Sequence, residues 1–507
     1  MKSIALLLFF IGSIHCLSAQ TTVKIIDSET KEVISYASVS VNNSENHISN
    51  DEGFFTISAA NSNPDAVVLV SFFGYAGRQL TVGGITSNNS VIALKPTPIE
   101  LDMVNVSGPP DAKVIMAEVK KNLSRNYGNS KQPVKDKLFI RKSTSFAPKI
   151  LDLEITESSG FTKNNLKTIN SEVTAFTSKL VSSPPRVFID MLCNYYNSPT
   201  KSTTDGKTLS SKLDVVKATT LKDETRMSSL DDIEKVTTDL FLKHLDSTKY
   251  YRFKSGWFGT KDTISMRKDF NKKKKKNKEV RNELTHAKTS VTNFTTDQNF
   301  LNSPSLDFIK ESDIYEYKYE GSVYMNDGNF AYVLTFKPRK GRANYKGKIY
   351  VSDSDFAVLR ADYSLYEGRK LNSVNVKLLL GVKTAQNISR GTIIYKPNKD
   401  GEGYFLQYAS EESGQYIYLN RPLKFIELAK SDKDVFALDV KIEGNMFEKT
   451  EYLNVNRSEI ASADFDAVKE ENFTYQKIRK YDASIWKDNA AIEPLEEMKQ
   501  FSVPIDN

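Results

Sequence analysis

The sequence predicts a mainly β protein with some helices, of the α+β class. We expect an N-terminal seven-stranded β-sandwich followed by a large antiparallel curved sheet or half-barrel. Three observations indicate this. The chain is rich in strand-favouring aromatic residues, with 24 Tyr and 28 Phe in 507 residues. Short runs alternate between apolar and polar residues and are separated by turn residues. Within 314–380, an Asn-Asp-Gly-Asn turn at 326–329 lies between two such runs, which is a strong hairpin signal.

The length of the chain limits the number of domains, and its net charge limits the kinds of partner that are expected. A chain of 507 residues is too long for one hydrophobic core and is expected to form about two to four domains. The formal net charge of +7 is small for this length and is dispersed along the chain. Nucleic acid is therefore not an expected partner.

Residues 1–20 have the pattern of a signal peptide. Lys2 precedes an apolar run at 4–14, and Leu17-Ser18-Ala19-Gln20 supplies the small residues of a cleavage site near Ala19/Gln20. The apolar run is too short to span a bilayer, so no transmembrane segment is expected in the mature chain. We expect an exported protein, periplasmic or associated with the outer membrane. Lipidation of Cys16 is disfavoured, because no small residue stands directly before it.

After cleavage, Cys193 would be the sole cysteine, so no internal disulfide is expected. It lies among apolar and aromatic residues at 187–196, which favours a buried structural thiol over a catalytic one.

Residues 21–97 show the strand and turn pattern of a small sandwich. Alternating residues at 37–41, the turn Asn50-Asp51-Glu52-Gly53 and the apolar run 66–73 are spaced as in short strands joined by tight turns. Gly53 is expected in the left-handed conformation that closes its turn.

This order of motifs resembles the carboxypeptidase regulatory-like (transthyretin-like) domain. The resemblance rests on Ile26-Asp27, Ala37-Ser38-Val39, the turn at 50–54 and Ser71-Phe72-Phe73-Gly74-Tyr75. It implies a non-catalytic sandwich that accompanies other domains and docks them. The zinc site of the peptidases that gave the family its name is not expected, because no His in the sequence is followed by Glu three positions later.

Residues 98–313 are predicted to be a linker and an α+β segment. Asp111 is expected to cap a helix that ends near Gly128, and further helices are expected over 187–196 and 229–245. A Lys-rich loop near 271–281 is predicted to be flexible. Contact of this loop with anionic lipid is left open as an alternative.

Residues 314–507 are predicted to form an antiparallel meander or half-barrel with a C-terminal tail. A sheet with one apolar face and few helices must curl to protect that face, which predicts a lined concavity. The residues expected to line the sheet face or cavity are Tyr332, Leu334, Phe336, Ile349, Val351, Leu359, Val376 and Leu378.

Two segments, 345–351 and 356–362, resemble the sheet of periplasmic lipoprotein carriers, a half-barrel that shelters acyl chains. The whole order of motifs also resembles an uncharacterised family of Gram-negative envelope proteins. These resemblances imply binding of a lipid or amphipathic ligand, or of an outer-membrane protein partner.

The sequence carries no recognised reaction signature. There is no Gly-x-Ser-x-Gly elbow, no phosphate-binding glycine loop and no Cys-x-x-Cys pair. Acidic pairs such as Asp353/Asp355 stand where turns favour Asp, so neither a metal nor a cofactor is predicted. We therefore expect a non-enzymatic envelope protein that binds an apolar or amphipathic ligand or an envelope partner. The alternatives are a structural or assembly factor of an outer-membrane complex and, third, a hydrolase with an unrecognised acid pair.

Overall fold

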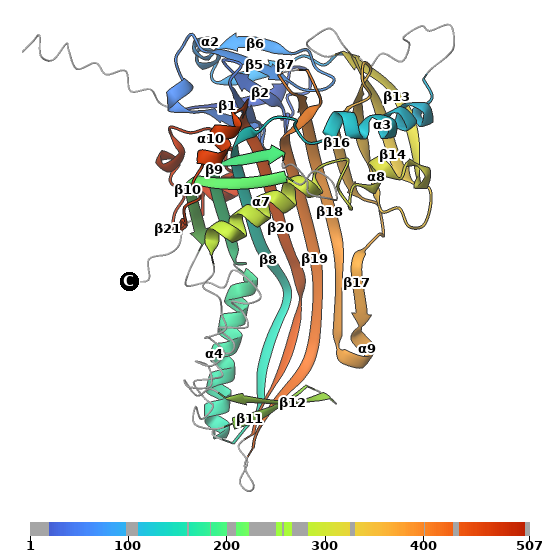
Figure 1. Cartoon of the computed structure of the whole chain (residues 1–507). Helices are drawn as coiled ribbons and strands as arrows, with labels where there is room; N and C mark the ends of the chain where they lie inside the picture. Colours follow the sequence, from blue (N-terminus) through green and yellow to red (C-terminus); the bar gives the residue numbers. More distant parts are fainter. Residues whose placement is uncertain are drawn as a thin grey trace, which may run out of the picture. The chain divides into compact units, whose positions relative to one another are not determined.

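The computed structural model describes residues 20–97, 110–159, 162–182, 184–199, 209–222, 250–255, 258–265, 282–324, 330–399, 401–428 and 435–501 (Figure 1). The predicted signal peptide before residue 20, the helix at 229–245, the Lys-rich loop and the turn at 326–329 lie outside these residues. The chain forms two compact units. The first comprises Met1–Ile99, Val323–Asn329 and Asp482–Lys499, and the second comprises Glu100–Ser322, Phe330–Tyr481 and Gln500–Asn507.

Seven short strands of the first unit form two sheets of three and four strands, in the orders β4-β1-β7 and β3-β2-β5-β6. Their buried aliphatic side chains form one core cluster. Gly53 has a φ of 78°, so it closes its turn as predicted. The strands are β1 (Thr21–Asp27), β2 (Ser38–Val41), β3 (Glu45–Ile48), β4 (Phe54–Ile57), β5 (Val67–Ser71), β6 (Arg78–Thr81) and β7 (Val91–Leu94), with α2 (Val82–Ser87) before β7.

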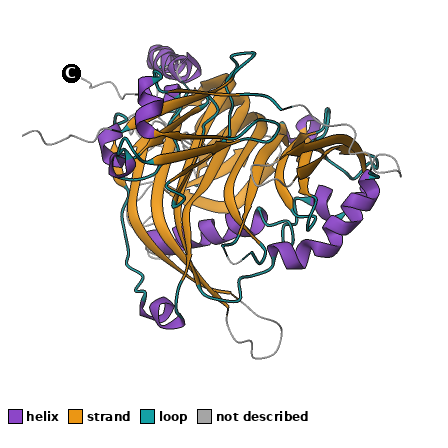
Figure 2. Ribbon diagram, turned by 90° about the horizontal axis from the view of Figure 1, so that it is seen from above, coloured by secondary structure: helices purple, strands orange, loops and turns teal. Residues whose placement is uncertain are grey.

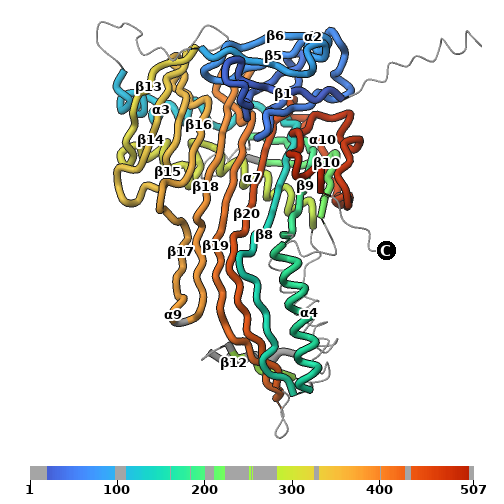
Figure 3. Tube along the Cα trace, turned by 180° about the vertical axis from the view of Figure 1, so that it is seen from behind, coloured from blue at the N-terminus to red at the C-terminus, as the bar shows by residue number. Residues whose placement is uncertain are grey.

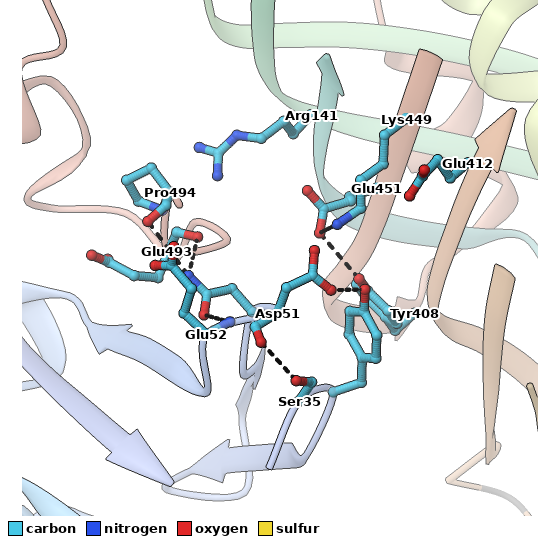
Figure 4. Close-up of polar contacts among 12 residues, drawn as sticks. Ser35, Asp51, Glu52, Arg141, Tyr408, Glu412, Lys449, Glu451, Glu493 and Pro494 are labelled. Atoms are coloured by element: carbon cyan, nitrogen blue, oxygen red, sulfur yellow. Dashed lines mark hydrogen bonds and ion pairs between the residues drawn. The ribbon is translucent and has the colours of Figure 1, made fainter. Parts of the chain in front are cut away.

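Residues Asp482–Lys499 of the C-terminal tail belong to this first unit, whereas the sequence pattern predicted the tail as part of the second β region. Asn50 Nδ2 donates to the carbonyl of Glu493 at 3.1 Å, and the amide of Ala59 donates to the carbonyl of Lys487 at 2.7 Å. Figure 4 shows Glu493 and Pro494 beside the Asp51–Glu52 turn. The tail contains η3 (Ala483–Trp486) and α11 (Glu496–Lys499). Hydrogen bonds of high sequence separation were not readable from the local pattern.

A single 14-stranded sheet dominates the second unit. It is mixed rather than wholly antiparallel, because β10 and β21 pair in parallel, and it is not closed. Its main path runs β13-β14-β15-β16-β18-β19-β20-β8-β9-β10-β21. The strands are β8 (Val134–Ser158), β9 (Arg186–Pro199), β10 (Leu209–Lys222), β11 (Tyr250–Ser255), β12 (Phe258–Ser265), β13 (Tyr315–Tyr324), β14 (Phe330–Pro338), β15 (Tyr345–Ser352), β16 (Val358–Leu365), β17 (Leu371–Val376), β18 (Val382–Pro397), β19 (Tyr404–Glu427), β20 (Val435–Glu459) and β21 (Gln476–Ile478).

The central strands are unusually long. β8 and β20 each have 25 residues, which corresponds to about 80 Å at the rise of an extended strand. They pair from Val134–Glu459 at one end to Ser158–Phe436 at the other, with three register shifts. Such irregularities bend and twist a strand, and Figure 2 shows the resulting curvature of the sheet. Since β8 pairs with β20, and β9 and β10 follow β8 in the same sheet, residues on both sides of position 313 belong to one structural unit.

One face of the large sheet, here called the covered face, is packed with helices. Near one end of the long strands it contacts α3 (Ala112–Tyr127), α7 (Glu283–Asp297) and α8 (Asp307–Lys310), and farther along it contacts α4 (Lys163–Ser182). α7 crosses the strands in Figure 1. The side chain of Asp111 accepts from the amide of Lys113, which confirms the predicted cap of α3. Within the described part of the chain, no helix is both long and apolar enough to cross a membrane.

The helix expected over 187–196 is wrong, because these residues form β9. Its apolar side chains alternate between two buried faces. Met191, Cys193 and Tyr195 contact the core under the helices, and Phe188 and Leu192 are buried on the other face. A strand buried on both faces loses the apolar–polar alternation that marks a strand in sequence. Cys193 is a buried free thiol whose pKa is raised by burial, in line with the structural role predicted for it.

Candidate binding site

The residues predicted to line a concavity lie mostly in a filled core. Leu334, Phe336, Ile349 and Val351 are buried in the cluster beneath the helices. The ring of Phe308, from α8, stacks on Phe336 with 4.6 Å between the ring centroids. The chain's own side chains thus occupy the space that a ligand would need there.

The other predicted residues are dispersed. Tyr332 is half-buried and packs beside the ring of Phe356, and Leu359 is buried in β16. Val376 ends β17, and Leu378 lies on the short helix α9 (Lys377–Leu380) and is fully exposed. Leu378 therefore does not lie on the sheet face predicted for it, because β17 stops at Val376 and the chain turns.

A cavity of about 180 Å³ lies elsewhere on the covered face, where the chain leaves α3 and where β8, β18, β19 and β20 begin or end. The second half of α7 and the segment after it form one wall. This volume corresponds to about six water molecules and is smaller than a typical site for a drug-sized ligand. The cavity therefore fits one small ring or head group, and an acyl chain exceeds it.

Aromatic rings form one side of this cavity. Tyr127, the last residue of α3, has its ring 4.8 Å from that of Tyr395 and 6.4 Å from that of Tyr404. Its hydroxyl donates to the carbonyl of Val358 at 2.9 Å and accepts from the Val358 amide at 2.5 Å, which fixes the ring. Burial raises the pKa of Tyr127, Tyr395 and Tyr404 above the usual value for tyrosine. These phenols therefore stay neutral at physiological pH.

A buried carboxylate also lines the cavity. Asp136 of β8 is 4% exposed, and its Oδ1 accepts from Asn454 Nδ2 at 2.7 Å. Arg457 Nη1 lies 3.7 Å from the same oxygen. The guanidinium of Arg457 also lies over the ring of Phe405, 5.3 Å from its centroid. The cross-strand pairing of β8 with β20 brings these groups together, and they hold the carboxylate in one orientation.

Neutral polar groups complete the lining. The hydroxyls of Tyr195 and Thr292 are 2.8 Å apart and link β9 to α7. Asn299 Nδ2 donates to the Tyr127 carbonyl at 3.1 Å, which joins the segment after α7 to the end of α3. Asn197, Asn302 and Gln132 add amides, which both donate and accept.

The lining contains one carboxylate, Asp136, and one cation, Arg457. General acid–base hydrolysis of a glycoside needs two carboxyl groups, so this cavity lacks the second group that the hydrolase alternative requires. Among the described residues, no group of three or more His, Cys, Asp or Glu side chains is placed to hold a metal ion. The arrangement suits recognition of a ring by stacking and hydrogen bonding.

A second polar cluster lies on the opposite face of the same strands. Arg141 makes a bidentate pair with Asp190, at 2.8 and 2.7 Å. In the next strand, Glu451 accepts from the Tyr408 hydroxyl at 3.2 Å and lies 3.4 Å from Lys449 Nζ (Figure 4). Each charge here has an opposite partner, so this cluster stabilises strand pairing and offers no free group for catalysis.

Sequence reasoning did not find the cavity residues. Asp136, Tyr395, Tyr452 and Arg457 are isolated in the sequence and meet only through the pairing of distant strands. Helix α7 was also not predicted, since seven of its fifteen residues are Thr, Ser or Asn, which favour helices weakly. The tyrosine-rich composition was the one signal that pointed toward an aromatic site.

The comparisons with known proteins give no family. No family model matches the sequence, and no curated protein matches it. Among solved structures, a DUF1329 family protein from Desulfovibrio piger ATCC 29098 is similar at 9% identity, over 70% of this chain and 97% of that chain, with a TM-score of 0.18. At that TM-score the likeness carries no argument about fold or function. The resemblances to the carboxypeptidase regulatory-like domain and to lipoprotein carriers stay predictions.

Proposed function

We propose that this is a non-enzymatic exported protein of the cell envelope that binds the polar head group of an amphipathic molecule. The proposed site is the tyrosine-lined cavity between α3, α7 and the ends of β8, β18, β19 and β20. Residues 21–97, as a carboxypeptidase regulatory-like module, would dock the protein in the periplasm or beside the outer membrane.

The lining of the cavity is the observation that carries this proposal. The lining combines the rings of Tyr127, Tyr395 and Tyr404, which would pack against a flat or puckered ring, with Asp136 and several amides, which would form hydrogen bonds at the edge of that ring. A hydroxyl-bearing ring, such as the sugar of a glycolipid head group, combines these two needs. A single sugar ring fits a cavity of about 180 Å³ better than an alkyl chain does.

Three probes that share one alkyl chain test the choice of head group: octyl glucoside, octyl phosphocholine and octanoate. Calorimetric titration below their micelle concentrations should show binding of octyl glucoside in preference to the other two. Equal binding of all three would mean that the alkyl chain is recognised instead, which contradicts the proposal. Absence of octyl glucoside binding would contradict it as well.

The variant Asp136→Asn tests the site itself. The amide keeps the size of the side chain and can still accept from Asn454, but it loses the charge that strengthens hydrogen bonds to hydroxyls. We expect octyl glucoside affinity to fall by roughly tenfold or more. Asp152→Asn is the matched control, because Asp152 is an exposed carboxylate on the same strand. Unchanged affinity in Asp136→Asn, or an equal loss in both variants, would place the site elsewhere.

A further inference from the structure

A second feature of the large sheet has no place in the head-group site: the end of the β17–β18 hairpin. The strands are joined by the single turn α9, after which Gly381, with a φ of 64°, begins the return. The side chain of Leu378 on this turn is 101% exposed, and Val374 on the adjoining strand is 52% exposed. Figures 1 and 3 show α9 at the free end of β17. The hairpin thus presents a leucine entirely to solvent.

A single exposed leucine is common and by itself indicates nothing. Here the surrounding sequence adds a second observation, which concerns charge. Residues 369–399 contain no Asp or Glu and seven Lys or Arg residues, although the whole chain has nearly balanced charges, with 70 basic and 63 acidic residues. Arg390 pairs with Glu412 at 2.7 Å and Lys396 is half-buried with a pKa lowered by burial, so the cations that matter at the exposed apolar tip are Lys377 and Lys383.

Two lysines of this segment lie over tyrosine rings of the neighbouring strand β19. Lys377 Nζ lies 4.1 Å from the centroid of the Tyr418 ring, and Lys383 Nζ lies 5.6 Å from that of Tyr416. The nearest acid in register is Glu443, which pairs with Tyr418 across β19 and β20 and lies 3.3 Å from Lys149 Nζ. That carboxylate thus has a cation of its own, and the tip keeps its positive charge.

Apolar side chains of the hairpin lie on the face opposite to the side chain of Lys383. The register pairs Val376 with Val382 and Val374 with Thr384, so these side chains point to one side and Lys383 points to the other. The hairpin end is therefore amphipathic, with apolar residues on one face and at its tip and with Lys383 on the other face, where it lies beside the tyrosines of β19. Lysine and tyrosine are the residues that anchor proteins at the membrane–water interface.

We propose that the β17–α9–β18 end binds the surface of a bilayer that contains anionic phospholipid, with Leu378 inserted among the acyl chains and Lys377 and Lys383 at the head groups. A projecting turn suits a bilayer, which it can penetrate, better than a protein interface, which buries a broad patch of about 800 Å² on each partner. The cations select the anionic surface, and the leucine supplies the apolar contact. This contact lies outside the head-group site and does not depend on it.

Sedimentation with vesicles tests this on the mature chain. Vesicles of phosphatidylcholine with about 30% phosphatidylglycerol should bind the protein, and vesicles of phosphatidylcholine alone should bind it much more weakly. Binding should weaken in high salt, because screening shortens the reach of the lysine charges. Equal binding to both vesicle types, or no binding to the anionic vesicles, would overturn the proposal.

Two variants locate the contact. Leu378→Glu should reduce binding to the anionic vesicles at least about tenfold, because it removes the inserted side chain and adds a repelled charge. Val114→Glu is the matched control: Val114 is an exposed apolar residue of α3, 61% exposed, and its replacement should leave binding unchanged. Equal losses in the two variants, or intact binding by Leu378→Glu, would contradict the assignment.

The variant Leu378→Trp measures how deeply the side chain at position 378 enters the bilayer. The emission of the introduced indole should shift to shorter wavelength with anionic vesicles and should be quenched by lipids brominated along the acyl chain. If that emission stays at the wavelength of an exposed indole while the protein sediments, another surface binds the vesicles. Binding of Leu378 in the apolar pocket of a protein partner is the competing outcome, and it predicts no shift with pure lipid vesicles.

Discussion

The large sheet has two halves that share strands but differ in how they are covered. We call the proximal half the part beneath α3, α7 and α8, and the distal half the part that includes β17 and the ends of β18, β19, β20 and β8 near α4. The proximal core consists mainly of side chains that are almost fully buried, such as Phe308 and Leu334. Among the described residues, one helix packs on the distal core, which is bordered by half-buried residues such as Leu419 and Phe425. The same long strands therefore run from a core beneath three helices to a core whose described border residues are half-buried.

This difference means that one half of the sheet mainly stabilises the fold, whereas surface for recognition is left mainly in the other half. In the proximal half the chain fills its own concavity and leaves only the small tyrosine-lined cavity. In the distal half, fewer described side chains cover the sheet, and apolar residues reach solvent. A curved sheet with an apolar face thus need not hold a ligand along its whole length, because helices from the same chain can occupy it.

The largest expected difference between the halves concerns core packing. Phe308→Ala removes a ring that is fully buried and stacked on Phe336, and it should lower the free energy of unfolding by about 3–5 kcal/mol. Phe425→Ala removes the same ring from a half-buried position and should cost about 1–2 kcal/mol. Urea unfolding of the two variants gives both values. Equal losses would mean that the two halves are equally well packed.

The parts of this fold that could be predicted are those with local signals. The fold class, the cap of α3 at Asp111 and the turn at Gly53 follow from composition and short patterns, and the structure confirms them. The identity of β9 and α7 could not be predicted in the same way. Burial on both faces gave β9 a helical spacing of apolar residues. Helix α7 is capped by the side chain of Asn282, and packing of Leu284, Ala287 and Val291 on the sheet stabilises it despite its weak helix formers.

The candidate site was still less predictable, because its residues come from strands that pair across large sequence separations. Asp136 and Arg457 are neighbours only through the register of β8 and β20. The apolar alternation at Leu334 and Phe336 was predicted to line a cavity, but alternation indicates burial and does not say whether a ligand or a helix covers the face. Helix α8 covers this face, and its four residues are too few to show a helical pattern in the sequence.

A smaller difference is expected for buried hydroxyl groups. Tyr127→Phe leaves the buried amide and carbonyl of Val358 without the hydroxyl that bridges them, so it should cost about 1–3 kcal/mol. Tyr418 in the distal half accepts from Asn420 at 3.5 Å, the outer limit of a hydrogen bond. Tyr418→Phe should therefore change the free energy of unfolding by less than about 0.5 kcal/mol. A large loss in Tyr418→Phe would show that distal polar contacts are as important as proximal ones.

Another small effect is expected at the border between the halves, where Glu411 of β19 is held beneath the end of α7. Its Oε2 accepts from Gln298 Nε2 at 2.8 Å, and burial, followed by repulsion from Asp297, raises its pKa above the ordinary value of 4.5. Between 4.5 and the raised pKa, the unfolded state loses its proton and the folded state keeps it. The stability contributed by this group is therefore lost as pH rises through that window.

Glu411→Gln removes this titration and should raise the free energy of unfolding at pH 7 by less than about 1 kcal/mol. Asp297→Asn removes the repulsion, the second cause of the shift, together with the titration of Asp297, whose own pKa is raised by burial, and should change the free energy of unfolding in the same direction. Urea unfolding at several values from about pH 4 to pH 7 measures both, and the curve of Glu411→Gln should fall less steeply with pH than that of the unaltered protein. Parallel curves would mean that Glu411 titrates alike in the folded and unfolded chain, and that the border beneath α7 is open to water like the distal half.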